Sequence, residues 1–407
     1  MKKSVFKKLF LLCGAVYFVS HLTRMNYAAS LTEIIKDMAL TKKTASLAVT
    51  GSFIMLWIGQ MVAGLLGDRV KPRRLVTMGL TATTVINLTM AFMRDITVMT
   101  VLWSLNGFFQ AFLWPPMTKV MAENLNSKEY ARVALAVSLS GSSSSIAVYL
   151  LTPLAISVAG WRYVFVFAAA FGLIMAITWG IGTIGVKENT KPTAVPSTAD
   201  GTKPTGSGVK QIILLSGLIP ICGAVIVQGA MKDGIATWMP TYIFDTYQLS
   251  SSLSILSSAM LPLFGVIGIS VAAVLYHKIG DLMTTSAVLY GVAFLAVSIM
   301  LPYSSSGMVI CTALTAIVSG CVYGVGHLLT AQLPHHFSKY GKVSTVSGVT
   351  SAAVYAGSSL STYAFAALSE NFGWSVTIAS WAALALIGGM VCLCCIKKWK
   401  KFVFDNR

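Results

Sequence analysis

Charged residues are scarce in this sequence, and acidic residues are the scarcest of all. Only 11% of the 407 residues are charged, with 13 Asp or Glu against 30 Lys or Arg. A soluble globular domain carries about a quarter charged residues, so water is not the main solvent of this chain. The mean hydropathy of +0.75 points the same way. The composition therefore favours a bundle in a membrane over a large soluble domain.

The sequence also lacks the patterns that mark most enzymes and metal proteins. It contains no nucleotide-binding loop, no zinc motif and no convincing pair of nucleophile and base. Its seven cysteines fall within or at the ends of apolar runs, where they are expected to fill apolar space. We therefore expect no enzyme activity, no metal and no cofactor.

Long apolar runs are abundant instead. A membrane-spanning helix needs about 20 mainly apolar residues, and twelve segments qualify. They cover residues 9–30, 44–66, 75–93, 97–121, 133–157, 163–185, 211–238, 252–276, 283–302, 307–330, 343–368 and 374–396. The sequence thus predicts an all-α membrane protein with twelve transmembrane helices in the lipid bilayer.

The middle of the chain carries the longest polar connection. Residues 187–210 are rich in Pro, Ser, Thr, Gly and Lys, a composition that cannot bury a core and is typical of a flexible linker. A Gly-Trp pair opens both the sixth and the twelfth predicted helices, at positions 160 and 373. We therefore predict two six-helix halves with pseudo-two-fold symmetry, 1–186 and 211–407, on either side of the linker 187–210.

The net charge of +17 is distributed unevenly along the chain. Of the 30 basic residues, 23 fall on one side of the predicted membrane, five fall on the other and two lie inside helices. Because basic loops stay on the cytoplasmic side, we expect both termini and the linker in the cytoplasm. The basic residues form short clusters rather than one exposed face, so we expect no nucleic-acid partner.

Arg24 is one of the two cations inside an apolar segment. It follows Tyr17 and His21 at spacings that place all three side chains on one face of a helix. An arginine inside a bilayer costs several kcal/mol (about 3 on insertion scales), so this side chain should face a polar cavity. The alternative is that Arg24 extends along its helix to the outer membrane surface.

Lys232 is the other intramembrane cation. Arginine offers a planar fork of donors and lysine a mobile point charge, so two such cations facing one cavity favour an anionic ligand. The alternative is a local ion pair with Asp233, although neighbouring residues on a helix point about 100° apart. Asp233 is also the one acidic residue that falls clearly within a predicted span. Proton-coupled carriers often use such carboxylates, so their scarcity favours exchange of one anion for another.

The loop after the second predicted helix has an ordered pattern of glycine, acid, base and proline. It reads Gly64-Leu-Leu-Gly-Asp68-Arg69-Val-Lys-Pro-Arg73. An acid beside several bases in a tight loop can form an ion pair between helices that changes with conformational state. We therefore expect Gly64, Asp68, Arg69 and Arg73 to act in gating.

This loop is similar to the signature of the major facilitator superfamily. More narrowly, the chain resembles the organophosphate:phosphate antiporters, the group of the glycerol-3-phosphate and hexose-phosphate transporters. The resembling stretches are spread over most of the chain, at 17–27, 64–73, 107–116, 232–242 and 346–374.

The resemblance implies a site for a phosphorylated solute. Arg24 and Lys232 match the two phosphate-holding cations of the family, with Lys232 where an arginine is usual. Cavity tyrosines of the family are matched by Tyr17, Tyr323 and Tyr355.

Three departures from the family pattern lower the positive charge of the implied site. Gln60 stands where glycerol-phosphate carriers have a lysine, and His21 replaces a tyrosine. Gly141 or a neighbour replaces a histidine. A monoanionic or carboxylate substrate therefore stays open beside a phosphate ester.

The sequence as a whole predicts a secondary transporter that works as a monomer by alternating access. Its expected substrate is a small organic anion, a phosphorylated sugar or polyol, exchanged for inorganic phosphate. The phosphate would bridge Arg24 and Lys232. Two other functions stay open on the sequence, a symporter of a carboxylate or other organic anion, and a membrane sensor of sugar phosphate from the same family.

Overall fold

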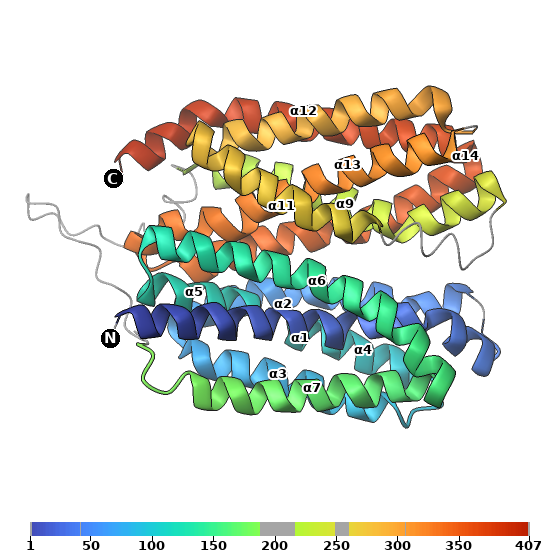
Figure 1. The fold of residues 1–407 in the computed structure, drawn as a ribbon, viewed down its shortest axis with the longest axis horizontal. Helices are drawn as coiled ribbons and strands as arrows, with labels where there is room; N and C mark the ends of the chain where they lie inside the picture. The colour runs from blue at the N-terminus through green and yellow to red at the C-terminus, as the bar shows by residue number, and fades with distance from the viewer. Residues whose placement is uncertain (1, 41, 188–215, 249–259, 306, 406–407) are drawn as a thin grey trace, which may run out of the picture. The chain divides into compact units, whose positions relative to one another are not determined.

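The computed structural model describes residues 2–40, 42–187, 216–248, 260–305 and 307–405, and these contain helices but no strand (Figure 1). The chain forms two compact units. Unit 1 comprises Met1–Pro192 and Gly341–Ala352, and unit 2 comprises Thr193–Tyr340 and Ala353–Arg407. The predicted linker, apart from Lys187, lies outside the described residues, and the predicted boundaries of the two halves stay a prediction.

Unit 1 contains seven labelled helices and the start of an eighth. They are α1 (Lys2–Asp37), α2 (Lys42–Arg69), α3 (Pro72–Met90), α4 (Ile96–Gln110), α5 (Trp114–Asn124), α6 (Ser127–Ala159) and α7 (Trp161–Gly182). The breaks between them follow local chemistry. Asp95 accepts a hydrogen bond from the Val98 backbone N–H at the start of α4, and Asn126 and Glu129 form a capping box at the start of α6.

Unit 2 contains α9 (Leu218–Tyr247), α11 (Met260–Ile279), α12 (Leu282–Met300), the 3-10 turn η1 (Leu301–Tyr303) and α13 (Met308–Gly326). The π-helix η2 (His327–Gln332) and the 3-10 helix η3 (Leu333–Tyr340) follow. The last helix, α14 (Val343–Asp405), starts in unit 1 and continues in unit 2.

Two glycines with matching backbone angles stand at the predicted repeat positions. Gly160 ends α6 with φ 85° and ψ 166°, and Gly373 interrupts α14 with φ 80° and ψ 175°. A Cβ at either position would meet no atom within 4 Å, so crowding does not require glycine there. The positive φ does, because it strains every L-residue with a side chain.

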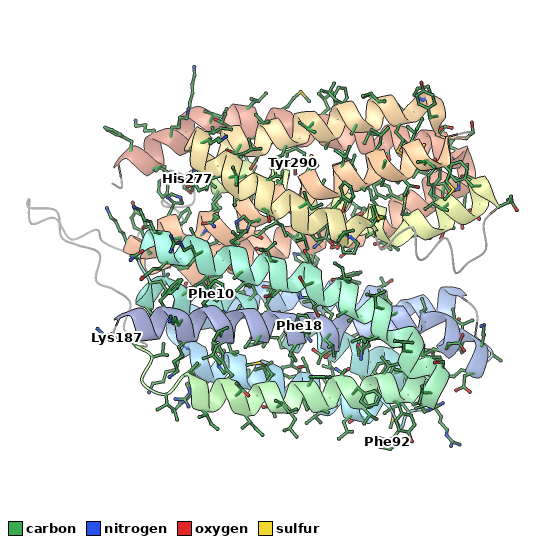
Figure 2. All side chains as sticks on the ribbon, in the orientation of Figure 1. Phe10, Phe18, Phe92, Lys187, His277 and Tyr290 are labelled. Carbon is green, nitrogen blue, oxygen red and sulfur yellow. The ribbon has the colours of Figure 1, made fainter. Side chains whose placement is uncertain are left out.

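Ten helices among the described residues are long and apolar enough to cross a membrane. Of the two remaining predicted spans, 75–93 is helical over residues 75–90, in α3, and 343–368 is helical throughout, in α14. Arginine and threonine in α3, and serine and threonine in α14, lower their mean hydropathy. Large apolar side chains are exposed along the helices. Phe92, in the turn after α3, is also exposed and projects from the edge of unit 1 (Figure 2). Such a surface suits lipid, not water.

Small residues bring the helices of each unit close together. In unit 1 the hydroxyl of Ser144 on α6 donates to the Phe18 carbonyl oxygen of α1 at 2.6 Å. In unit 2 a Cβ on Gly268 of α11 would overlap the Gly320 backbone of α13. Glycine and serine allow this approach because they carry little beyond Cα.

Candidate functional site

Three of the predicted binding residues form a row on one face of α1. The rings of Tyr17 and His21 have centroids 4.7 Å apart, and Arg24 Nη2 lies 3.1 Å from His21 Nε2. The other imidazole nitrogen, Nδ1, lies 3.1 Å from the Tyr17 carbonyl oxygen. A carbonyl only accepts and a guanidinium only donates, so these partners assign the proton to Nδ1 and leave Nε2 as acceptor. Arg24 is thus held by a neutral histidine.

Aromatic and small residues of unit 1 support this row. The Trp114 ring of α5 lies 5.2 Å from the Tyr17 ring, centroid to centroid. On α6, a Cβ added to Gly141 would come within 2.8 Å of the Tyr17 ring and 3.1 Å of the His21 ring. Gly141 therefore provides the space that the two rings occupy.

A buried polar network, which the sequence analysis missed, lies beside this row. The Thr23 carbonyl oxygen accepts from the side-chain amides of Asn87 on α3 (3.0 Å) and Asn106 on α4 (3.1 Å). The Gln110 amide donates to the Thr23 hydroxyl at 2.7 Å and its oxygen accepts from Ser20 at 2.8 Å. The signal was in the sequence, as three amides inside predicted spans. The network fixes the rotation of α1 and hence the direction of Arg24.

The predicted site residue of α9, Lys232, carries an ion pair in unit 2. Its Nζ lies 3.3 Å from Asp233 Oδ1, and the two side chains are 21% and 19% exposed. The alternative of a local pair is therefore what the structure contains, despite the poor geometry expected for helix neighbours. The second oxygen of Asp233 accepts a 2.5 Å hydrogen bond from Ser358 of α14. This bond holds the carboxylate from the opposite side.

The remaining predicted binding residues are divided between the two units. The ring centroid of Tyr323, on α13, lies 5.8 Å from Lys232 Nζ, within cation–π range. Tyr355 is buried on α14, one turn before Ser358. Gln60 is buried on α2 of unit 1, and its side-chain oxygen has no hydrogen-bond partner among the residues that the structure describes. A buried acceptor left unpaired is a natural position for a ligand donor.

The signature loop makes a different contact from the expected ion pair. The buried Asp68 carboxylate accepts from the backbone N–H groups of Ser344 (3.2 Å) and Thr345 (2.9 Å) and from the Thr345 hydroxyl (2.5 Å). These groups begin α14, where backbone N–H groups lack helical partners and favour negative charge. Nearby, a Cβ on Gly64 would lie 2.9 Å from Gly348 Cα, so glycine is needed for this approach.

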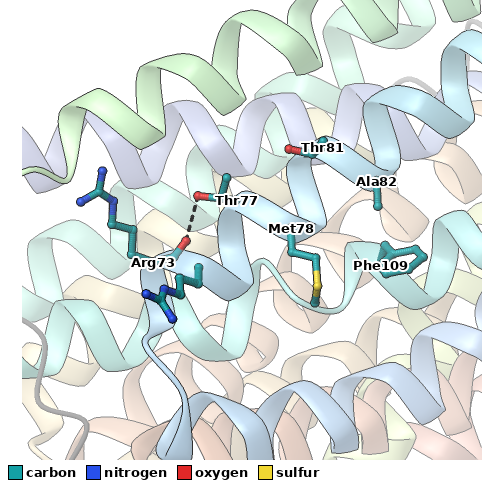
Figure 3. Close-up of a pocket in the computed structure, with 7 residues that line it drawn as sticks. Arg73, Thr77, Met78, Thr81, Ala82 and Phe109 are labelled. Carbon is teal, nitrogen blue, oxygen red and sulfur yellow. Dashed lines mark hydrogen bonds between the residues drawn. The ribbon is translucent and has the colours of Figure 1, made fainter.

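Arg73, also of the signature loop, faces the surface of unit 1. It donates to the Gly180 carbonyl oxygen of α7, and its own carbonyl oxygen accepts from Thr77 at 2.9 Å (Figure 3). It lines an open groove of about 600 Å³ with Arg74, Thr77, Met78, Thr81, Ala82 and Phe109. None of the predicted substrate-binding residues lines this groove. Arg69 is exposed.

The described residues contain no cluster of three or more His, Cys, Asp or Glu side chains that could hold a metal ion. In unit 1, an imidazole and aromatic rings lie beside Arg24. In unit 2, a carboxylate and the Tyr323 ring lie beside Lys232.

Most of the chain is similar to known proteins. The family model described as Major Facilitator Superfamily matches residues 13–362. A solved structure of a bacterial homologue of the iron transporter ferroportin, in an outward-facing state, superposes with a TM-score of 0.73. It covers 96% of this chain and 99% of that chain at 12% identity, which speaks for the fold alone.

The sequence relatives align with smaller parts of the chain. A probable hexose phosphate transport protein of Chlamydia trachomatis is 28% identical over 39% of this chain and 34% of its own length. The membrane sensor protein UhpC of Salmonella typhimurium is 30% identical over 26% of this chain and 24% of its own length. The glycerol-3-phosphate transporter of Bacillus subtilis is 22% identical over 55% of this chain and 54% of its own length. The chain matches about a third of the length of the hexose phosphate proteins.

Proposed function

Because the chain belongs to the major facilitator superfamily, we propose that it is a secondary transporter of a small organic anion. The preferred substrate class is a phosphorylated sugar or polyol, exchanged for inorganic phosphate. Relatives named for hexose phosphate and glycerol-3-phosphate transport support this class. The superfamily and its apolar helices make the chain an integral multi-pass membrane protein. We propose a bacterial inner membrane location with both termini in the cytoplasm.

The observation that carries the proposal is Arg24 inside an apolar span. This span runs from Val5 to Leu31, and Arg24 is oriented there by neutral His21. A cation in a bilayer costs several kcal/mol, so it persists where it has a use. We propose that Arg24 and Lys232 both contact the anion, with Tyr17, Tyr323, Tyr355 and Gln60 as hydrogen-bonding groups. Alternating access would then move the anion from one membrane face to the other.

Exchange in proteoliposomes tests this function. Vesicles loaded with radiolabelled inorganic phosphate should release label when sugar phosphates or polyol phosphates are added outside. Arg24→Ala and Lys232→Ala should lose exchange while still reaching the membrane. Arg94→Ala, which removes an exposed cation outside the spans, should keep it. Full activity of Arg24→Ala would contradict the assigned role.

A sensing role is the second candidate, because one relative is named a membrane sensor protein. Saturable binding of a sugar phosphate to the purified protein without any flux in vesicles would favour sensing over transport. Uptake driven by a proton or sodium gradient, with no phosphate exchange, would favour a symporter instead.

A further inference from the structure

Asp233 places a negative charge directly beside one of the two proposed anion-binding cations. Both of its oxygens are engaged, one by Lys232 Nζ at 3.3 Å and one by the Ser358 hydroxyl at 2.5 Å. The contacts come from two different helices, α9 and α14, so the carboxylate is held in place. Both members of the ion pair keep about a fifth of their side-chain surface exposed. An arriving anion would therefore meet Lys232 and Asp233 together.

The pair changes the charge that the protein offers. Lys232 and Asp233 cancel, while His21 beside Arg24 is the neutral tautomer that accepts a hydrogen bond. If both cations contact the anion, as in the proposed function, these four side chains contribute one net positive charge to its binding. In a partly dehydrated site, charges act more strongly than in water, so an unbalanced substrate charge is costly.

Substrate charge also sets the cost of leaving water. The cost of removing an ion from water grows with the square of its charge in the Born description, so a dianion costs about four times as much as a monoanion. One net positive charge balances a monoanion and leaves a dianion with one charge uncompensated. Asp233 adds direct repulsion that is twice as large for the dianion.

We propose that Asp233 determines substrate charge, so that the protein selects singly charged organic oxyanions over doubly charged phosphate esters. This inference rests on the proposed function as an anion carrier. Within the proposed small organic anions, it selects by charge: phosphate esters in their monoanionic form, sulfate esters and carboxylates.

Two ligands with the same sugar but different charge separate the effect of ligand charge from that of ligand shape. Glucose 6-sulfate carries one negative charge, whereas glucose 6-phosphate carries two at pH 8, since the second ionisation of such esters lies near pH 6. Binding of each to the purified full-length protein is measured by ligand-induced thermal stabilisation over a concentration series. Wild type should bind the sulfate ester more tightly. Asp233→Asn keeps the shape and a hydrogen-bond acceptor for Ser358, and should shift the affinity ratio toward the phosphate ester by about tenfold.

Matched variants make the result specific. Asp245→Asn removes an exposed carboxylate of the same helix and should leave the ratio unchanged. Asp233→Glu keeps the charge and should retain the preference for the sulfate ester. Asp233→Ser provides the same test if the amide variant does not accumulate in the membrane. Binding of both esters with a ratio that Asp233→Asn does not change would overturn this inference alone. Binding of neither ester to wild type would overturn the proposed sugar-phosphate function together with it.

Discussion

At the scale of single residues, the two intramembrane cations have partners of different charge. Arg24 meets an uncharged nitrogen of His21, whereas Lys232 meets the carboxylate of Asp233. Hydrogen bonds between a charged and a neutral group contribute about 1.5–3 kcal/mol, so the His21 contact is worth enough to orient Arg24. In the proposed anion binding, Arg24 would start from a contact with a neutral partner and Lys232 from an ion pair.

Removing the imidazole should weaken substrate binding more than folding. We expect His21→Phe to raise the KM for phosphate exchange about tenfold, because Arg24 loses the acceptor that orients it. His21→Gln, which keeps an acceptor, should recover part of the loss. Initial exchange rates over a range of external substrate concentrations provide the measurement, and an unchanged KM in His21→Phe would speak against the orienting role.

Gly141 should tolerate no side chain beneath the aromatic row. A Cβ there would lie 2.8 Å from the Tyr17 ring, and overpacking of this kind costs about 1–3 kcal/mol. We expect Gly141→Ala to lower the melting temperature in detergent. Gly180→Ala, where an added Cβ meets nothing within 4 Å, should leave it unchanged or slightly raised. Equal effects of the two substitutions would contradict the crowding argument.

Sequence reasoning reached some of these residues and missed others for a physical reason. Arg24 and Lys232 could be singled out, because a cation inside an apolar run is recognised from the sequence alone. The partners of Asp68 could not, because Ser344 and Thr345 are 276 and 277 positions away. A backbone N–H group leaves no mark in a sequence, so these contacts could not be predicted. The expected ion pair between helices, which changes with conformational state, stays a prediction.

At the scale of elements, Asp68 acts as a cap on the first turn of α14. It pairs with two backbone N–H groups that have no acceptor within their own helix. We expect Asp68→Ala to lower the free energy of unfolding by about 1 kcal/mol, as loss of a cap does. Asp68→Asn, whose amide oxygen still accepts, should lose less. Chemical or thermal unfolding in detergent separates the two, and identical losses would show that the charge, not the acceptor, matters.

The ends of α1 and α7 are joined by an exposed ion pair with a predictable pH dependence. Asp37 accepts hydrogen bonds from the Arg162 guanidinium at 2.7 Å and from the Trp161 indole N–H at 3.0 Å. The Arg162 hydrogen bond is the main cause that holds the pKa of Asp37 below its usual range. A lowered pKa means that the pair stabilises the fold above the ordinary aspartate pKa of about 4. Its contribution is lost as the pH falls through the lower folded-state value.

Comparison of wild type with Asp37→Asn tests this dependence. The melting temperature of wild type should exceed that of the variant at neutral pH, and the difference should shrink as the pH is lowered below about 4. A difference that stays constant with pH would indicate that packing around Asp37, not its charge, is responsible.

The predicted spans show what hydropathy can and cannot find. Helices occur at all twelve predicted positions among the described residues, but the ends differ, and α1 and α14 extend well beyond their apolar parts. Apolar runs reveal the lipid-facing part of a helix and little about its polar extensions. Span 343–368 was found despite its serine and threonine content, because those residues alternate with apolar ones.

At the scale of the whole molecule, the predicted all-α membrane fold of major facilitator type is confirmed by the family match and by the helical structure. Its orientation stays a prediction from the distribution of Lys and Arg. The lysines between 187 and 210 provide the test, because trypsin cuts after lysine. Inverted membrane vesicles should give two fragments of about half the chain, and right-side-out vesicles should not. Cleavage at this segment in right-side-out vesicles alone would reverse the orientation.

The amides around Thr23 limit how unit 1 can move. Asn87 and Asn106 tie the α1 backbone to two other helices, and the low dielectric of the interior makes each of these bonds hard to exchange for another. Helix α1 can therefore neither turn about its axis nor slide unless α3 and α4 go with it. A cargo held by Arg24 would be carried by a stiff block of helices, so the bending that transport requires must occur at the margins of that block.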